Sequence, residues 1–200
     1  MGVEGDKTGD GWGRGPCVPW LIRGGMEGPR IFLQSLAPKF PEEPYLIRMA
    51  NYWLLKSEPN VYSIADLQRD GSTCWEGVRN YSARNNMRRM TVGDLALFYH
   101  SNANPPCVAG VCRIKKEAYP DRYAWNEKSK YYDDKSPKDS PRWFMVDVEF
   151  LEAFDRLVSL EEIKSTRSFE DMVLVKQGRL SVQPVKKSEF DAIVRMGRRK

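Results

Sequence analysis

The sequence contains little histidine or cysteine and no long apolar run. One histidine, His100, and four cysteines occur among 200 residues. No stretch approaches the roughly 18 consecutive apolar residues that a membrane-spanning helix requires, so we expect no membrane partner. The glycine patterns of nucleotide-phosphate loops and the G-x-S-x-G turn of hydrolases are also missing. These absences remove the support for nucleotide-cradle and serine-hydrolase chemistry.

The cysteines show no metal-binding pattern. Cys74, Cys107, Cys112 and His100 are the available set, but their spacing fits no common zinc motif. A catalytic Cys–His or Ser–His pair would have to use His100, and nothing in the spacing selects its nucleophile. We therefore expect no metal and no cofactor, and the sequence favours a non-catalytic domain. Few cysteines without secretory features predict reduced thiols in a cytoplasmic protein, or a nuclear one in a eukaryote.

Charge and composition divide the chain near residue 50. Residues 1–49 hold nine of the 15 glycines and six of the 13 prolines, with no apolar period. Such a segment buries too little surface to offset its ordering entropy, so we expect a disordered extension. Met49 directly precedes the first patterned segment, and we hypothesise that it is the natural start, with a domain over 50–197. The net charge of +5 arises after residue 49 and permits an anionic partner.

Apolar patterning predicts a mixed set of short elements. Strands are expected at residues 52–57, 95–100, 108–115, 142–150 and 180–185. Helices are expected after Ser63, from Asn80 to Met90, after Ser159 and from Ser188. Residues 117–141 form a polar loop with five aromatic side chains, and a loop of this length is usually functional or mobile. Antiparallel strands with short helices indicate an α+β domain around a small curved sheet or barrel.

The densest chemical feature lies at residues 74–89. It combines Trp75, a glycine turn, a helix start and four arginines. Guanidinium groups and helix N-termini favour phosphate oxygens, and a tryptophan can stack on a base for about 1–3 kcal/mol. From composition alone the plainer interpretation is favoured, in which Trp75 belongs to the core and the arginines form a solvated helix face.

Six segments, taken together, resemble the EVE domain of the thymocyte nuclear protein family. They are YWLLKSEP (52–59), CWEGVRNYSARNNMR (74–88), GDLALFYHSN (93–102), EAYPD (117–121), PRWFMVDVEF (141–150) and RLSVQP (179–184). Their order is that of the family, and they span residues 51–196. The resemblance implies a PUA-like fold, a bent β-barrel of mainly antiparallel strands with peripheral short helices, related to YTH and ASCH domains.

The resemblance also implies a function and a site. It implies a domain that binds modified DNA or RNA and accepts a flipped base, with modified cytosine as the leading candidate, in an aromatic pocket. The sequence does not determine the oligomeric state, and a monomer is favoured. The residues expected to form that base pocket are Trp53, Ser57, Trp75, Val78, Asn80, His100, Ser101 and Trp143. The residues expected to bind phosphates are Arg79, Arg84, Arg88, Lys56, Lys115 and Lys116.

Alternatives remain open for the domain and for single residues. The domain can instead be a nuclease or base-processing enzyme of ASCH-like type, with His100, Glu76 or Asp94 as general base, or a small-ligand module. Trp53 can be a core residue, because tryptophan is usually highly buried. Ser57 can cap a turn, and Glu58 can form a buried ion pair with Arg79 or Arg84.

Overall fold

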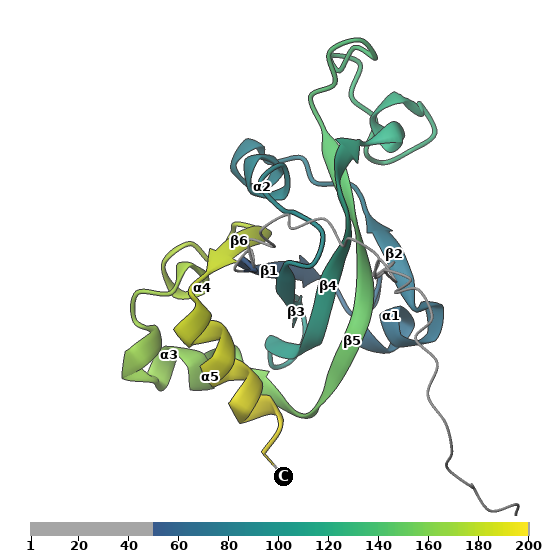
Figure 1. The fold of residues 1–200 in the computed structure, drawn as a ribbon. Helices are drawn as coiled ribbons and strands as arrows, with labels where there is room; N and C mark the ends of the chain where they lie inside the picture. Colours follow the sequence, from purple (N-terminus) through teal and green to yellow (C-terminus); the bar gives the residue numbers. More distant parts are fainter. Residues whose placement is uncertain (1–49, 200) are drawn as a thin grey trace, which may run out of the picture. The chain divides into compact units, whose positions relative to one another are not determined.

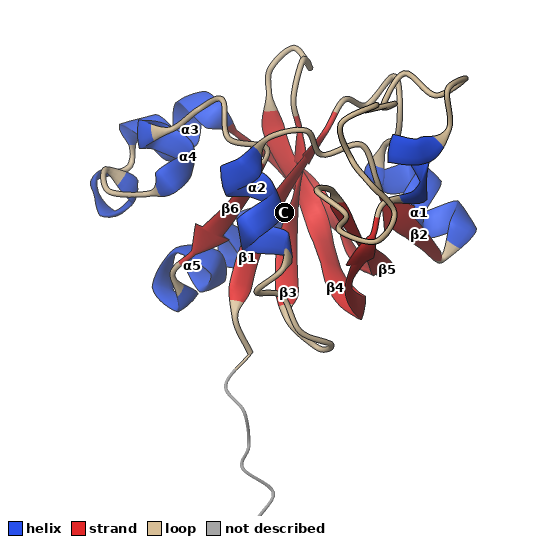
Figure 2. Ribbon diagram, turned by 90° about the horizontal axis from the view of Figure 1, so that it is seen from above, coloured by secondary structure: helices blue, strands red, loops and turns tan. Residues whose placement is uncertain are grey.

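A single mixed sheet organises the part of the chain that the computed structural model describes, residues 50–199 (Figures 1 and 2). The predictions for residues 1–49 lie outside this range. The strands are β1 (Tyr52–Ser57), β2 (Ser72–Trp75), β3 (Leu95–His100), β4 (Cys107–Pro120), β5 (Phe144–Ser159) and β6 (Val182–Val185). Their order is β2-β5-β4-β3-β1-β6. Only the β1–β3 pair is parallel among these neighbours. The predicted α+β class is confirmed, although hydrogen bonds do not close the sheet into a barrel.

Short helices surround the sheet. They are α1 (Ile64–Asp70), α2 (Tyr81–Met87), α3 (Leu160–Ser165), α4 (Val173–Lys176) and α5 (Lys187–Gly197), with 3-10 turns at Arg122–Trp125 and Arg167–Phe169. The predicted capping box is present, because Ser63 and Asp66 each accept a hydrogen bond from the other's backbone N–H. Asn80 caps α2 by accepting from the Ala83 N–H, as predicted. That helix ends at Met87, before the predicted Met90.

Two hydrophobic cores lie on opposite faces of the sheet. Alternation along β1 places Trp53 and Leu55 in one core and Leu54 in the other. The first core includes side chains of α1 and α2, and the second includes side chains of α3, α4 and α5. Figure 1 shows α3, α4 and α5 grouped together on one side of the sheet. Each face therefore has its own helical cover.

Helix α2 connects the two edges of the sheet. It directly follows the edge strand β2 and packs against the other edge strand, β6. The Asn86 side-chain amide donates a hydrogen bond of 2.8 Å to the Val182 carbonyl of β6. Pro184 lies in β6, where an edge strand tolerates its missing N–H. The bent sheet is thus bridged by a helix rather than by a ladder of hydrogen bonds.

The β4–β5 hairpin is longer than the sequence predicts. Strand β4 continues to Pro120 and β5 runs from Phe144 to Ser159, so much of the predicted 117–141 loop remains but its first residues are strand. The hairpin extends beyond the neighbouring strands, where its side chains turn polar, and carries the hairpin loop (residues 121–143) at its tip (Figure 1). Register shifts near Ile114 and Lys116 break the alternation on which the prediction relied.

Asp94 fixes the start of β1 and β3. Its buried carboxylate accepts hydrogen bonds from the Asn51 N–H at 3.0 Å, the Trp53 Nε1–H at 2.9 Å and the Thr91 N–H at 3.1 Å. Burial alone would raise the pKa of Asp94, but the hydrogen bonds from Trp53, Asn51 and Thr91 outweigh it, and the pKa is lowered. The ionised carboxylate is therefore the form that the fold stabilises.

We predict that Asp94→Asn lowers the free energy of unfolding by about 1–3 kcal/mol at pH 7, because an amide cannot accept from every donor. The folded-state pKa lies below the ordinary 3.8, so the contribution is present above about pH 4 and is lost as the pH falls through the folded value. Urea denaturation at pH 7 and pH 2 measures both effects. Asp134→Asn, at an exposed position, is the control. An equal loss at both pH values would contradict the assignment.

Candidate functional site

A cleft of about 580 Å³ opens where the two edges of the bent sheet approach each other. One wall comes from β2 and the turn after it, including Trp75 and residues 76–79. The opposite wall comes from the end of β1 and from residues 178–181 before β6. Ser57 and Ser101 meet at its floor, because parallel β1 and β3 end side by side, and the Ser101 N–H donates to the Ser57 carbonyl at 2.8 Å. The topology therefore creates the cleft.

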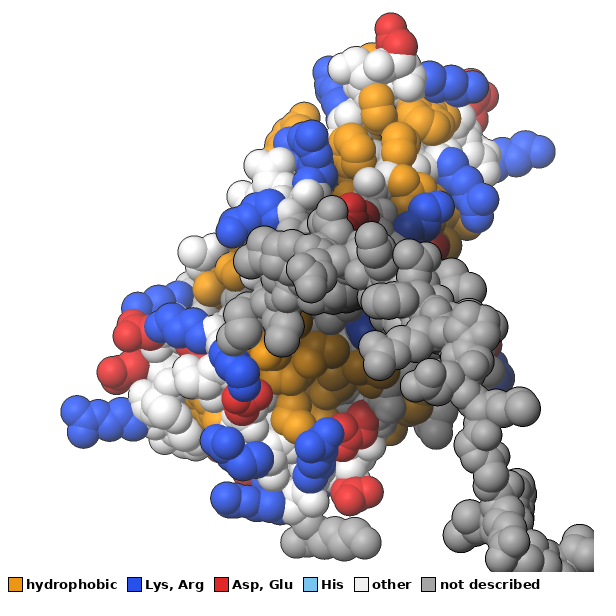
Figure 3. All heavy atoms as spheres, viewed as in Figure 1, with side chains coloured by type: hydrophobic (Ala, Val, Ile, Leu, Met, Phe, Trp, Pro, Cys, Tyr) orange, Lys and Arg blue, Asp and Glu red, His pale blue; other side chains and the backbone are white. Residues whose placement is uncertain are grey.

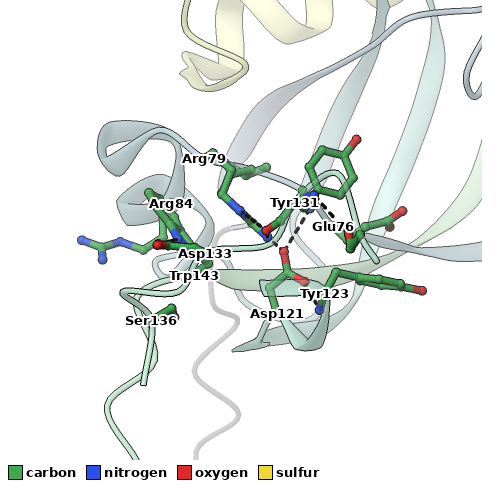
Figure 4. Close-up of polar contacts among 12 residues, drawn as sticks. Glu76, Arg79, Arg84, Asp121, Tyr123, Tyr131, Asp133, Ser136 and Trp143 are labelled. Carbon is green, nitrogen blue, oxygen red and sulfur yellow. Dashed lines mark hydrogen bonds and ion pairs between the residues drawn. The ribbon is translucent and has the colours of Figure 1, made fainter. Parts of the chain in front are cut away.

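The hairpin loop forms a third wall and is held by a buried ion pair. Arg79 Nη1 lies 2.8 Å from Asp121 Oδ2, and the Asp121 side chain is fully buried. Asp121 also accepts from the Gly77 N–H at 3.0 Å, and Arg79 Nε donates to the Tyr131 carbonyl at 2.9 Å. Figure 4 shows Arg79 pointing toward both partners. The predicted Glu58 partner for Arg79 is wrong, because Asp121, far along the sequence, takes that place.

Tyr131 packs its ring directly on the backbone of Gly77. A Cβ at Gly77 would lie 2.4 Å from the Tyr131 ring, and the glycine has φ +77°. Only glycine provides both the space and the left-handed backbone at this turn. The Arg79 guanidinium lies over the same ring, 5.5 Å from its centroid. Tyr131 is thereby fixed as a wall of the cleft.

The structure brings four of the predicted base-pocket residues to this cleft: Ser57, Trp75, Val78 and Ser101. Trp75 is 8% exposed and packs edge-to-face against Phe98, so only part of the indole is open. The Ser57 hydroxyl donates to the Tyr62 carbonyl at 2.7 Å, which is the turn-capping role left open for it. Their contact with a base remains a prediction.

The other four predicted pocket residues do not line the cleft. Trp53 is 2% exposed and held by Asp94, as a core tryptophan, and Asn80 caps α2. His100 Nε2 accepts from the Ile64 N–H at 3.1 Å, and burial lowers the pKa of His100, so both effects favour the neutral ring. Trp143 donates to Asp133 at 2.6 Å and lies against the ring of Tyr81.

The predicted phosphate-binding residues are similarly divided. Arg79 and Lys56 line the cleft, but both have internal partners, and Lys56 Nζ donates to the Gly178 carbonyl at 2.7 Å. Burial lowers the pKa of Lys56. The remaining four lie outside the lining: Arg84 over the Tyr81 ring, Arg88 over Phe144, Lys116 over Tyr119, and Lys115 bonded to Ser72. Their phosphate contacts stay predictions.

The cleft lining also includes Tyr62, Lys130, Tyr131 and Arg179, which were not among the predicted site residues, and Glu76, which was named only as an alternative general base. The aromatic content of residues 117–141 was a signal for Tyr131, but no sequence pattern indicated Arg179. Neither Lys130 nor Arg179 forms an ion pair within residues 50–199. Both side chains are exposed, and Lys130 Nζ lies 4.9 Å from the centroid of the Tyr131 ring. Lys56 also has no ion pair in this range, but it is half-buried and bonded to the Gly178 carbonyl.

Basic side chains are also distributed over the surface. Figure 3 shows Lys and Arg along the margin of one face, with hydrophobic side chains gathered on the projecting hairpin loop. Within residues 50–199 no group of three His, Cys, Asp or Glu side chains is placed to hold a metal ion. No helix in that part of the chain is long and apolar enough to span a bilayer.

Comparison with known proteins identifies the family. The EVE domain model matches residues 51–196, so the chain belongs to the EVE domain family, and the predicted PUA-like fold is confirmed. Human thymocyte nuclear protein 1 is 41% identical over 168 residues, which cover 74% of this chain and 75% of that protein.

Several solved structures are also similar to this chain. A hypothetical protein from Leishmania major is 50% identical, with a TM-score of 0.72 over 74% of this chain and 95% of that chain. The human THYN1 protein in complex with DNA containing 5-methylcytosine is 40% identical, with a TM-score of 0.71 over 76% of this chain and 99% of that chain.

We predict that Gly77→Ala displaces Tyr131 and loosens the hairpin loop. The free energy of unfolding should fall by about 1–3 kcal/mol more than in Gly71→Ala, and hydrogen exchange over residues 121–143 should accelerate. Gly71 is the matched control, because its φ of +72° is similar but no atom lies within 4 Å of an added Cβ. Equal losses in the two variants would show that the contact with Tyr131 carries no energy.

Proposed function

We propose that this domain binds DNA and accepts a methylated cytosine, rotated out of the duplex, in the cleft between the sheet edges. The observation that carries the proposal is a cleft of about 580 Å³ lined by Tyr62, Trp75 and Tyr131, with two exposed cations, Lys130 and Arg179, at its margin. Its volume suits a small ligand group such as a nucleotide. The 40% identical human protein in complex with 5-methylcytosine DNA supports the choice of ligand.

The energetics of base eversion suit an aromatic cleft. Extruding a base from a duplex costs a few kcal/mol, which the protein must offset. Stacking on aromatic side chains contributes about 1–3 kcal/mol per base. Removing the methyl group from water adds only about 0.8 kcal/mol. Tyr62 and Tyr131 are more exposed than Trp75. Tyr131 rests on Gly77, so a base would stack on the ring face where Lys130 now lies, as that lysine turns to a phosphate.

Phosphate contacts supply the sequence-independent part of the affinity. Arg179 precedes β6 and Lys130 belongs to the hairpin loop, so they approach the cleft from different walls. An everted nucleotide carries a phosphate on each side, and two cations on separate walls match that arrangement. Each phosphate neutralised releases counterions, so affinity falls with salt.

The relatives also bear on partner and location. The DNA complex of the human protein favours DNA over RNA for this chain, and RNA binding stays a prediction, as does the monomeric state. Because the vertebrate relatives are named nuclear proteins, we propose a nuclear rather than cytoplasmic location.

Fluorescence anisotropy with a labelled duplex tests the proposal. A duplex carrying one 5-methylcytosine should bind more tightly than the unmodified duplex, and both affinities should fall steeply between 50 and 200 mM salt. Equal affinity for the two duplexes would overturn base reading. Binding of the free nucleoside without salt dependence would indicate a small-ligand module instead.

Two variants separate base contact from phosphate contact. Tyr131→Ala should reduce the preference for the modified duplex, because about 1–3 kcal/mol of stacking on the everted base is lost, whereas the unmodified duplex binds mainly through its phosphates. Arg179→Ala should weaken both duplexes alike and reduce the salt slope by about one. Lys164→Ala, an exposed lysine on α3 outside the cleft, is the control. A change of preference in Arg179→Ala with none in Tyr131→Ala would reverse the assigned roles.

A further inference from the structure

Recognition of a methyl group cannot by itself identify 5-methylcytosine. Thymine carries the same methyl group on the same ring carbon and is abundant in DNA. The two bases differ at C4, where cytosine has an amino donor and thymine a carbonyl acceptor, and at N3. A cleft that accepts methylated cytosine, as proposed above, therefore needs a group that distinguishes a donor from an acceptor at C4.

Two carboxylates line the cleft, and they differ in burial. Glu58 is exposed, whereas Glu76 is half-buried beside Trp75. No cation lies within ion-pairing distance of Glu76 among residues 50–199. Its carboxylate points away from Arg79 in Figure 4. Partial burial of a charge without a counter-ion is unfavourable, and nothing in the fold requires an acid at this turn.

One oxygen of Glu76 has a neutral partner and the other is open. The Cys74 thiol donates to Glu76 Oε2 at 3.4 Å, while Oε1 has no donor among residues 50–199. Burial raises the pKa of the Cys74 thiol, and the charge and hydrogen bond of Glu76 raise it further. The thiol therefore remains protonated and orients the carboxylate without neutralising it. Glu76 is thus a lining residue of the cleft whose carboxylate has one oriented oxygen and one oxygen without a donor among residues 50–199.

We infer that Glu76 accepts a hydrogen bond from the exocyclic amino group of the everted methylcytosine, and that it thereby excludes thymine. A carboxylate is the usual acceptor for the cytosine amino group. Opposite thymine the same carboxylate faces a carbonyl oxygen, and both are acceptors. Sites built on a hydrogen bond reject analogues that leave it unmade far more strongly than apolar pockets reject a missing methyl group. The inference rests on the proposed function and names its selectivity residue.

Glu76→Gln tests the inference, because an amide can donate to a carbonyl as well as accept. Oligonucleotides should carry 5-methylcytosine, thymine or 5-methyl-2-pyrimidinone opposite an abasic site, so that base-pairing costs cancel. We expect the wild-type protein to prefer 5-methylcytosine to thymine by about ten- to a hundred-fold, and Glu76→Gln to reduce that ratio to near one. Because all three ligands carry the same phosphates, the altered protein charge cancels in the ratio.

The pyrimidinone and a control variant sharpen the result. This base lacks the C4 amino group, so the wild-type protein should bind it about ten-fold or more weakly than 5-methylcytosine, and the loss should shrink in Glu76→Gln. Glu161→Gln, at an exposed acid of α3 outside the cleft, should behave as wild type.

The outcomes separate this inference from the proposed function. If the wild-type protein prefers 5-methylcytosine to cytosine but Glu76→Gln keeps the wild-type ratio of 5-methylcytosine to thymine, the inference is overturned and the proposed function stands. If the wild-type protein shows no preference for 5-methylcytosine over cytosine, the proposed function itself fails.

Discussion

The buried ion pair between Arg79 and Asp121 is the interaction on which the cleft depends. Asp121 is fully buried and accepts from the Gly77 and Tyr123 backbone N–H groups as well as from Arg79. Removing the partner of a buried charge typically costs about 3–5 kcal/mol, so the two segments stay together. The pair ties the turn after β2 to the tip of the β4–β5 hairpin, and it places Tyr131 over Gly77. Without it the cleft would lack one wall.

Sheet topology supplies the rest of the site. The edge strands β2 and β6 are far apart in the ladder, yet α2 bridges them through packing and the Asn86–Val182 hydrogen bond. The parallel β1–β3 pair ends at the floor between them. A fully closed barrel would have paired the backbone N–H and C=O groups of the edge strands β2 and β6, but it would have left no gap between those strands. The open sheet and the cleft therefore have one structural cause.

Local signals in the sequence predicted local structure well, and the site only in part. The Ser63 capping box, the Asn80 cap and the strand at residues 52–57 are short-range features, and each appears as predicted. The Asp121 partner of Arg79 joins positions 42 residues apart, a distance over which no periodicity acts. Trp53 and Trp75 cannot be distinguished by residue type. Tertiary packing places Trp53 in the core, bonded to Asp94, and Trp75 at the cleft. Residue type therefore identified candidates, and topology selected among them.

The cleft carries charged side chains of both signs. Arg79 is neutralised by Asp121, and Lys56 is half-buried and bonded to the Gly178 carbonyl. Lys130 and Arg179 are therefore the exposed cations at the margin, while Glu76 lines the same cleft with a negative charge. A negative charge at this position weakens the attraction for any nucleic acid, modified or not. Its presence is unfavourable for affinity and favourable only for choosing among bases. In the proposed function, selectivity at the base edge and affinity from the margin are thus assigned to groups of opposite sign, which lets each be set independently.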